Sequence, residues 1–265
     1  YKQAYRVFRS LGYEVCPVEM DANGMEPELL TRSGANVAYV MPSHQFPTGV
    51  VMPVGRRQEL LKWAMEAPDR YIIEDDYDSE FRYRGKPIPA LQGMDRSGRV
   101  IYLGTFSKCI APAIRVSYLV LPTHLLLRYR SQTSFYASTV SRIDQNILYQ
   151  FLAGGYFERH LNRMRAVYKT KHDLLLEQIE PLRERFEIRG EHAGIHILLT
   201  SRQGESEEQL IQKAEEAGVK VYGLSSYFIH PQHNHRPATV VLGYASLSEE
   251  QIVEGIRLLM ECWDA

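Results

Sequence analysis

Long hydrophobic runs are absent from this sequence, and cysteines are few. No stretch approaches the roughly 20 apolar residues that a membrane-spanning helix requires, and no secretory signal opens the sequence. The three cysteines, Cys16, Cys109 and Cys262, lie far apart and show no metal-ligand spacing. A disulfide framework and a cysteine-based metal site are therefore not expected, and the pattern is typical of a reducing compartment such as the cytoplasm.

An excess of charge of either sign is also absent. The 265 residues include 31 basic and 32 acidic side chains, which leaves a formal net charge of −1. Because the two signs are spread evenly, no basic patch for nucleic acid or for an anionic membrane is indicated. If a longer parent protein binds DNA, we expect it to do so elsewhere. Apolar residues make up 45% of the chain, enough for one or two globular domains with a substantial core.

The first part of the chain alternates between helical and strand-like patterns. Helices are expected at residues 2–11 and 56–67. Strands are expected at residues 13–18, 36–41, 70–74, 100–103 and 116–121. Strands separated by helical crossovers favour a mostly parallel α/β sheet, in which functional groups gather at the carboxyl ends of the strands.

The second part of the chain begins with one long helical pattern. Apolar residues recur at three- and four-residue steps from about Gly155 to Pro181, which indicates a connecting helix. Ser206 and Ser248 each open a further helix with a capping box. Strands are expected at residues 195–199, 219–222 and 239–242. We therefore expect a large domain over residues 1–154, a connecting helix over 155–182 and a small α+β domain over 183–265.

An acidic run ends one of the expected strands. Side chains alternate between the two faces of a strand, so Asp75 and Tyr77 share one face while Glu74 and Asp76 lie on the other. A carboxylate and a hydroxyl two residues apart are suited to the ring nitrogen and the ring oxygen of pyridoxal phosphate (PLP). Taken alone, such a run is more typical of a solvated strand end or a metal site. Asp76 is not expected to take part.

A lysine follows the next expected strand, residues 100–103. Lys108 is a candidate for Schiff-base formation with PLP, which requires a placed and partly deprotonated amine. Thr105 and Ser107 supply hydroxyl groups beside it, and Arg115 supplies a guanidinium, so these three are candidates for the phosphate. A Ser-Lys pair by itself usually lies exposed at the protein surface and has no functional role. In this order, and within an α/β pattern, the lysine and the acidic run together favour a PLP site.

Three motifs carry a resemblance to a known family. They are PSHQFPTG at residues 42–49, IIEDDYDSEF at residues 72–81, and the segment 104–115 that contains Lys108. Nearly the whole chain is similar to fold-type I PLP-dependent proteins, and more narrowly to the aminotransferase-like effector-binding domain of MocR/GabR-type bacterial transcription regulators of the GntR family.

The resemblance implies a fold, a cofactor and partners. It implies the fold-type I aminotransferase-like fold, with PLP bound at Lys108 as an internal aldimine. Asp75 would contact the pyridine nitrogen and Tyr77 the ring oxygen, and the phosphate would be held by Thr105, Ser107 and Arg115. The family also implies a homodimer and an N-terminal winged helix-turn-helix domain that binds DNA. We expect that domain, and the first part of the large PLP-binding domain, to lie outside this sequence.

The sequence departs from ordinary aminotransferases at the places that bind substrate. Val241 stands where the family's aminotransferases have an arginine that clamps the substrate carboxylate, and Phe46 stands where they have an asparagine. Gln3 and Ser226 replace two arginines of the member that senses γ-aminobutyrate, which argues against that ligand. Arg236, or a histidine of residues 230–235, is an alternative source of charge, although this histidine-rich loop is more typical of an exposed segment than of a metal site.

Three functions remain open on the sequence alone. The first is an effector-sensing domain that responds to a small amino compound, and the second is a genuine PLP-dependent aminotransferase of a small amino acid. The third is a sensor of PLP itself. Regulators of this family govern amino acid, PLP and D-alanine or cell-wall metabolism, so control of D-alanyl-D-alanine ligase is a further hypothesis.

Overall fold

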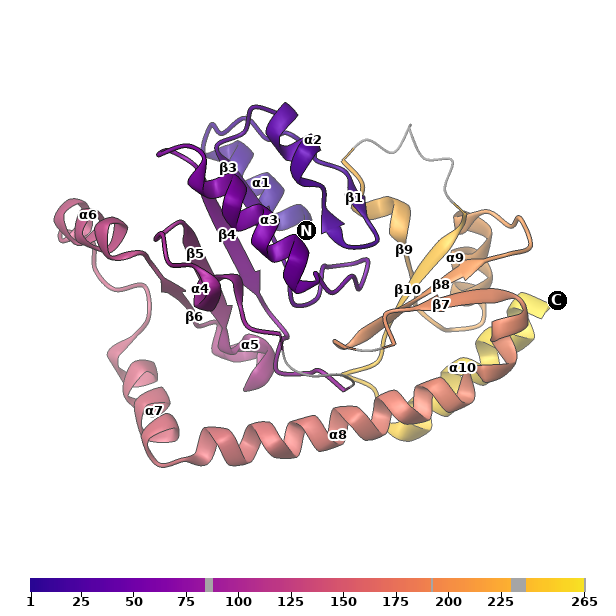
Figure 1. Ribbon diagram of the computed structural model, residues 1–265. Coiled ribbons are helices and arrows are strands. Elements are labelled where there is room, and N and C mark those ends of the chain that lie inside the picture. The colour runs from indigo at the N-terminus through magenta and orange to yellow at the C-terminus, as the bar shows by residue number, and fades with distance from the viewer. Residues whose placement is uncertain (84–87, 192, 230–236, 265) are drawn as a thin grey trace.

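Two lobes, each a sheet with accompanying helices, are joined by one long helix (Figure 1). The computed structural model describes residues 1–83, 88–191, 193–229 and 237–264. The connecting helix, α8 (Tyr156–Gln178), runs beneath both lobes and follows Gly155, which adopts a positive φ of 65°. Within the described residues, no helix is both long and apolar enough to cross a membrane.

The first lobe is built on a four-stranded sheet of order β3-β4-β5-β6. Its strands are β3 (Val37–Val40), β4 (Tyr71–Asp76), β5 (Val100–Thr105) and β6 (Ser117–Val120). The first three strands are parallel, and β6 pairs with β5 in the antiparallel direction. The expectation of a mostly parallel sheet is confirmed.

Seven helices and a small hairpin accompany this sheet in the described residues. The helices are α1 (Lys2–Ser10), α2 (Pro27–Arg32), α3 (Val54–Met65), α4 (Leu91–Met94), α5 (Phe106–Cys109), α6 (Thr123–Thr133) and α7 (Arg142–Ala153). The hairpin consists of β1 (Met20–Asp21) and β2 (Gly24–Met25), and a 3-10 turn, η1 (Pro112–Ile114), precedes β6. The lobe's core forms where α3 buries Leu60, Trp63 and Ala64 together with Ala38 and Ile72 of the sheet.

The second lobe is an antiparallel sheet of order β7-β8-β10-β9 with helices packed on it. Its elements are η2 (Glu180–Glu184), β7 (Phe186–Arg189), β8 (His196–Ser201), α9 (Glu207–Glu216), β9 (Tyr222–Gly223), η3 (Leu224–Tyr227), β10 (Thr239–Gly243) and α10 (Glu249–Asp264). Ser206 and Gln209 form the expected capping box at α9. Reciprocal hydrogen bonds between Ser248 and Gln251 form the expected capping box at the start of α10.

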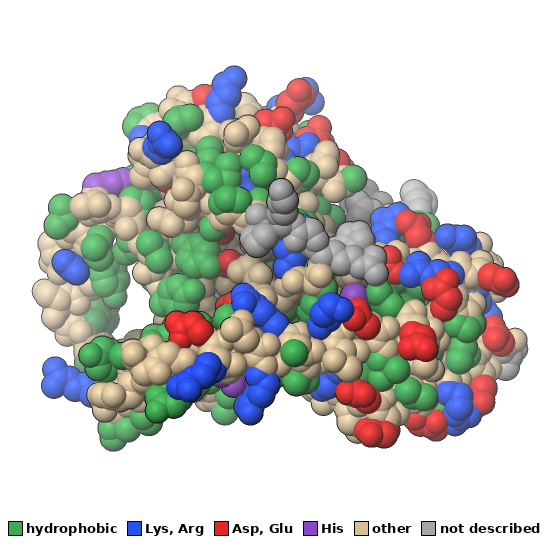
Figure 2. Space-filling model, turned by 60° about the horizontal axis from the view of Figure 1, so that its bottom comes forward, with side chains coloured by type: hydrophobic (Ala, Val, Ile, Leu, Met, Phe, Trp, Pro, Cys, Tyr) green, Lys and Arg blue, Asp and Glu red, His purple; other side chains and the backbone are tan. Residues whose placement is uncertain are grey.

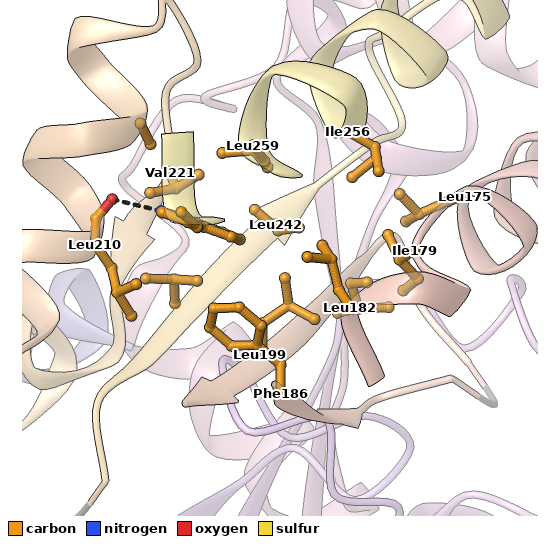
Figure 3. Close-up of a cluster of buried hydrophobic side chains, with 14 of the residues drawn as sticks. Leu175, Ile179, Leu182, Phe186, Leu199, Leu210, Val221, Leu242, Ile256 and Leu259 are labelled. Atoms are coloured by element: carbon orange, nitrogen blue, oxygen red, sulfur yellow. Dashed lines mark hydrogen bonds between the residues drawn. The ribbon is translucent and has the colours of Figure 1, made fainter. Parts of the chain in front are cut away.

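The small lobe has the larger continuous core (Figure 3). Leucine and isoleucine side chains from α8, the sheet and α10 meet there, and the fully buried Trp263 donates its indole N–H to the carbonyl of Leu210 at 3.0 Å. The connecting helix shares in both lobes, because Leu175 belongs to this core and Leu161 packs with Phe81 and Cys109 of the first lobe. Burial at both ends of one helix ties the lobes together.

The structure corrects several expected elements. Residues 13–18 do not form a strand, because the segment is largely exposed, lies beside no partner strand and contains Pro17, which lacks the N–H of a ladder bond. The long helix ends at Gln178 rather than near Pro181, since the proline begins a 3-10 turn instead. The strand expected at 219–222 is reduced to Tyr222–Gly223. Strand β7 and helices α6 and α7 were not predicted.

Candidate functional site

The predicted site residues lie where β4 and β5 end at one edge of the parallel sheet. Asp75 pairs in register with Leu103, and Asp76 with Gly104, immediately before β5 passes into α5. Within β4 the burial alternates, with Glu74 and Asp76 buried and Asp75 half-buried on the opposite face. The alternation that assigned Asp75 and Asp76 to different faces is present in the strand.

The two aspartates have different partners. Asp76 accepts hydrogen bonds from the hydroxyl of Tyr102 at 2.7 Å and from the backbone N–H of Ser79 at 3.1 Å, so it holds the end of the strand in place. Asp75 accepts a short hydrogen bond from the hydroxyl of Tyr39. Burial raises the pKa of the Asp75 carboxyl, and the bond from Tyr39 opposes that rise.

Tyr77 is joined to a residue that sequence reasoning did not place. Its hydroxyl oxygen lies 3.0 Å from Nδ1 of His44, and the same nitrogen lies 2.8 Å from Oδ2 of Asp78. Burial first, and the charge of Asp78 second, raise the pKa of Tyr77, which keeps the phenol protonated. The only sequence signal for His44 was its place in the motif at residues 42–49.

Lys108 lies in α5, a single helical turn that begins directly after β5. Thr105 caps this turn by accepting a hydrogen bond at 3.1 Å from the backbone N–H of Ser107, so these two predicted residues lie together. The side chain of Lys108 is exposed, and that of Cys109 points into the packing between the lobes. Arg115 follows η1 as an exposed residue with a φ of 48°.

His196 lies next to His44 and is close enough to Lys108 to be affected by its charge. Burial first, then the positive charges of His44 and Lys108, lower the pKa of His196 to about 4, so its ring is neutral at pH 7. The rings of His196 and His44 lie 4.9 Å apart, and His44 bonds to Tyr77. The hydrogen-bond partner of His196 is the carbonyl of Pro47 in the first lobe, at 2.9 Å.

The residues fit the chemistry of PLP. A half-buried carboxyl, a protonated phenol and an exposed primary amine lie around one sheet edge, which are the groups that a pyridine nitrogen, a ring oxygen and an aldehyde require. In the described part of the chain, no cluster of three or more histidine, cysteine or acidic side chains is arranged to hold a metal ion.

The residues at the four departing positions carry no charge. Val241 is buried on the face of β10 opposite Val240 and Leu242, which belong to the core of the small lobe, and it offers no donor to a carboxylate. The ring of Phe46 packs edge-on against Tyr77, His196 and Tyr227, so it forms an apolar wall. Gln3 is exposed on α1 and Ser226 belongs to η3. Arg236 and the histidine-rich loop at residues 230–235 lie outside the described residues.

Comparison with known proteins identifies relatives over the whole length. The family model "Aminotransferase class I and II" matches residues 1–258. An uncharacterised HTH-type transcriptional regulator of Bacillus subtilis, YdeL, is 43% identical over 99% of this chain, which covers 56% of that regulator. The probable rhizopine catabolism regulatory protein MocR of Rhizobium meliloti is 34% identical over 98% of this chain and 52% of its own length. The chain thus spans about half the length of these curated relatives.

Solved structures show the same fold. The kynurenine aminotransferase of Pyrococcus horikoshii, determined in complex with PMP, superposes with a TM-score of 0.85 at 29% identity and covers 100% of this chain and 67% of its own. A multiple-substrate aminotransferase from Thermococcus profundus gives the same TM-score at 30% identity, over 99% of this chain and 66% of its own. Both are enzymes, whereas the two curated relatives above are regulators.

Proposed function

We propose, from the premise that this chain belongs to the family of class I and II aminotransferases, that it is the PLP-binding, effector-sensing domain of a bacterial transcription regulator. Support comes from regulators that are 43% and 34% identical over nearly all of this chain. Because the chain spans only about half of their length, the DNA-binding domain of the parent protein would lie outside it. Such a protein would work in the cytoplasm.

In this proposal each site residue has one task toward the cofactor. Lys108 holds PLP through a Schiff base, Asp75 keeps the pyridine nitrogen protonated, and Tyr77 donates a hydrogen bond to the ring oxygen. The phosphate is bound by the hydroxyl groups and the guanidinium that surround the lysine, namely Thr105, Ser107 and Arg115. When bound, PLP supplies an electron-withdrawing ring next to a carbon that reacts with amines.

The valine at position 241 is the observation that favours a sensor over an enzyme. The side chain is aliphatic and only 5% exposed, so it offers no counterpart to the carboxylate-binding arginine of the family's aminotransferases. Without that clamp the domain can accept an amino compound at the cofactor but lacks a main anchor for orienting an amino acid through repeated turnover. A genuine aminotransferase of a small amino acid is the second candidate, because structural relatives at about 30% identity are aminotransferases.

A spectral titration of the full-length protein loaded with PLP tests the proposal. Small amino acids of both hands and γ-aminobutyrate are added one at a time, and the visible absorbance band of the cofactor is followed. We expect one amino compound to change the absorbance band until the change saturates, without sustained release of a keto acid. Turnover at about 1 s⁻¹ or faster would establish an enzyme instead. Binding of PLP with no response to any amine would identify a PLP sensor.

We also propose that the domain forms a homodimer through the outer end of the first lobe. Apolar side chains on or beside β6, α6 and α7 lie exposed there (Figure 2): Leu119, Leu127, Phe135, Ile143, Ile147 and Tyr149. Apolar surface of this extent is typical of an interaction site, and the charges of both signs that cover the small lobe are typical of solvated surface. The division into residues 1–154, 155–182 and 183–265 belongs to the same proposal.

Replacing Ile147 with aspartate is expected to shift the protein from dimer to monomer, because the charge would be desolvated in an apolar interface. Sedimentation velocity over a range of protein concentrations measures the change. Val253→Asp is the control. It also places an aspartate at an exposed aliphatic residue of a helix, here α10, and is expected to leave the dimer intact. A monomeric parent protein would overturn the proposed dimer.

A further inference from the structure

A buried histidine–aspartate pair lies beside Tyr77. His44, which lies between β3 and α3, is 2% exposed, and the side chains of His44 and Asp78 are each 1% exposed. Nδ1 of His44 is 2.8 Å from Oδ2 of Asp78 and 3.0 Å from the hydroxyl oxygen of Tyr77. Two oxygens therefore approach one ring nitrogen, and this arrangement constrains where the protons lie.

The position of the proton on His44 follows from the chemistry of its partners. An ionised carboxylate can only accept hydrogen bonds, so Nδ1 must carry the hydrogen that Asp78 receives. The same N–H faces the oxygen of Tyr77, which acts there as an acceptor. A phenol that accepts through its oxygen keeps its own proton for another acceptor, which is the carboxylate of Asp78 in the cofactor-free protein and would be the ring oxygen of PLP when PLP is bound. The raised pKa of Tyr77 ensures that this proton is present at neutral pH.

The small lobe prevents the histidine ring from moving. Gly194 lies so close that a Cβ at this position would be 2.0 Å from a ring carbon of His44. The glycine is itself fixed, since its N–H donates to the carbonyl of Phe81 and its carbonyl accepts from Tyr244, each at 2.8 Å. The ring of His196 also packs against the ring of His44, with the two ring centroids 4.9 Å apart. A ring confined in this way presents one orientation to Tyr77.

We propose that His44, oriented by Asp78, is a positioning residue that fixes the Tyr77 hydroxyl as a hydrogen-bond donor toward the ring oxygen of PLP. The inference rests on the proposed function, because it requires PLP at Lys108. It adds two residues that lie outside the predicted cofactor-binding set. Since Gly194 and His196 belong to the small lobe, the same contacts link the position of that lobe to the cofactor's ring oxygen.

The test uses the pH at which the Schiff base of the PLP-loaded, full-length protein loses its proton, read from its visible absorbance. A donor to the ring oxygen withdraws electron density and favours the deprotonated imine, so losing the donor raises this midpoint. His44→Asn is expected to raise it by roughly one pH unit, the size of one hydrogen bond. The ionisable groups that face this cluster, and are kept in all variants, are Asp75, Asp76, His196 and Lys108.

A double-mutant cycle separates positioning from a general structural effect. Tyr77→Phe is expected to give a shift similar to that of His44→Asn, and the double variant no further shift, because both act through one hydroxyl. His172→Asn is the matched control: His172 is also a 1% exposed histidine, and it bonds to the carbonyl of Glu191 rather than to Tyr77, so the midpoint of this variant should stay at the parent value. Additive shifts, or an unchanged midpoint in His44→Asn, would overturn the inference.

A second measurement needs neither PLP nor a variant. Nitrogen-15 NMR of the imidazole groups in the cofactor-free protein reports which ring nitrogen of His44 carries hydrogen. We expect hydrogen on Nδ1, and a tautomer with hydrogen on Nε2 alone would contradict the inference even if His44→Asn fails to fold. A parent protein that shows the expected tautomer but no visible band with PLP would instead overturn the proposed function.

Discussion

Lys108→Ala is expected to abolish the visible absorbance that PLP gives when it is covalently bound. The reason is chemical: the ε-amine is the group that condenses with the aldehyde, and alanine leaves no amine side chain in the turn that follows β5. PLP would then be held only by hydrogen bonds and ion pairs and would be removed by dialysis. Absorbance spectra before and after dialysis measure the loss, which we expect to be complete.

A second lysine provides the control for this experiment. Lys62 lies exposed on α3, and Lys62→Ala should retain the spectrum of the parent protein. If Lys108→Ala still shows the imine absorbance, the lysine assignment is wrong, and with it the placement of the cofactor at this edge of the sheet.

Glu74→Ala is expected to destabilise the protein by about 3–5 kcal/mol, the usual loss when one partner of a buried charged pair is removed. The side chains of Glu74 and Arg57 are both fully buried, with Nη1 and Oε1 4.0 Å apart. The carboxylate also accepts the backbone N–H groups of Leu91 and Gln92 at 2.9 and 2.8 Å. Alanine would leave a buried guanidinium without its ion-pair partner and two N–H groups without an acceptor.

Urea unfolding of the parent protein and of Glu74→Ala measures the difference in their free energies of unfolding. Glu59→Ala is the matched control, because Glu59 also pairs with an arginine, Arg56, but at the surface of α3. Exposed ion pairs contribute at most about 1 kcal/mol, so this variant should lose little. Equal losses in the two variants would contradict the role we assign to the buried pair.

The sequence predicted those parts of the site that depend on local periodicity. Alternation along β4 placed Asp75 and Asp76 on opposite faces, and the capping boxes at Ser206 and Ser248 are present as expected. These features depend on neighbours within a few residues, so the sequence records them directly. By contrast, residues 13–18 have the alternation of a strand but no partner, and pairing is a property of the fold.

The rest of the site depends on contacts between distant residues. His44 meets Asp78 from 34 residues away, Asp75 accepts from Tyr39 36 residues earlier, and the carbonyl of Pro47 bonds to His196 across 149 residues. No spacing rule connects such positions. The roles of Thr105, Ser107 and Arg115 at a phosphate stay predictions, although the bond between the first two shows that the turn before the lysine is ordered.

Borohydride reduction followed by peptide mass mapping tests the central claim most directly. Reduction converts a Schiff base between PLP and a lysine into a stable amine, so the modified residue is identified after proteolysis. We predict that the full-length protein, incubated with PLP and reduced, carries the phosphopyridoxyl group on the peptide that contains Lys108 and on no other. Modification of a different lysine, or of none, would contradict the assignment of this chain as a PLP-binding domain.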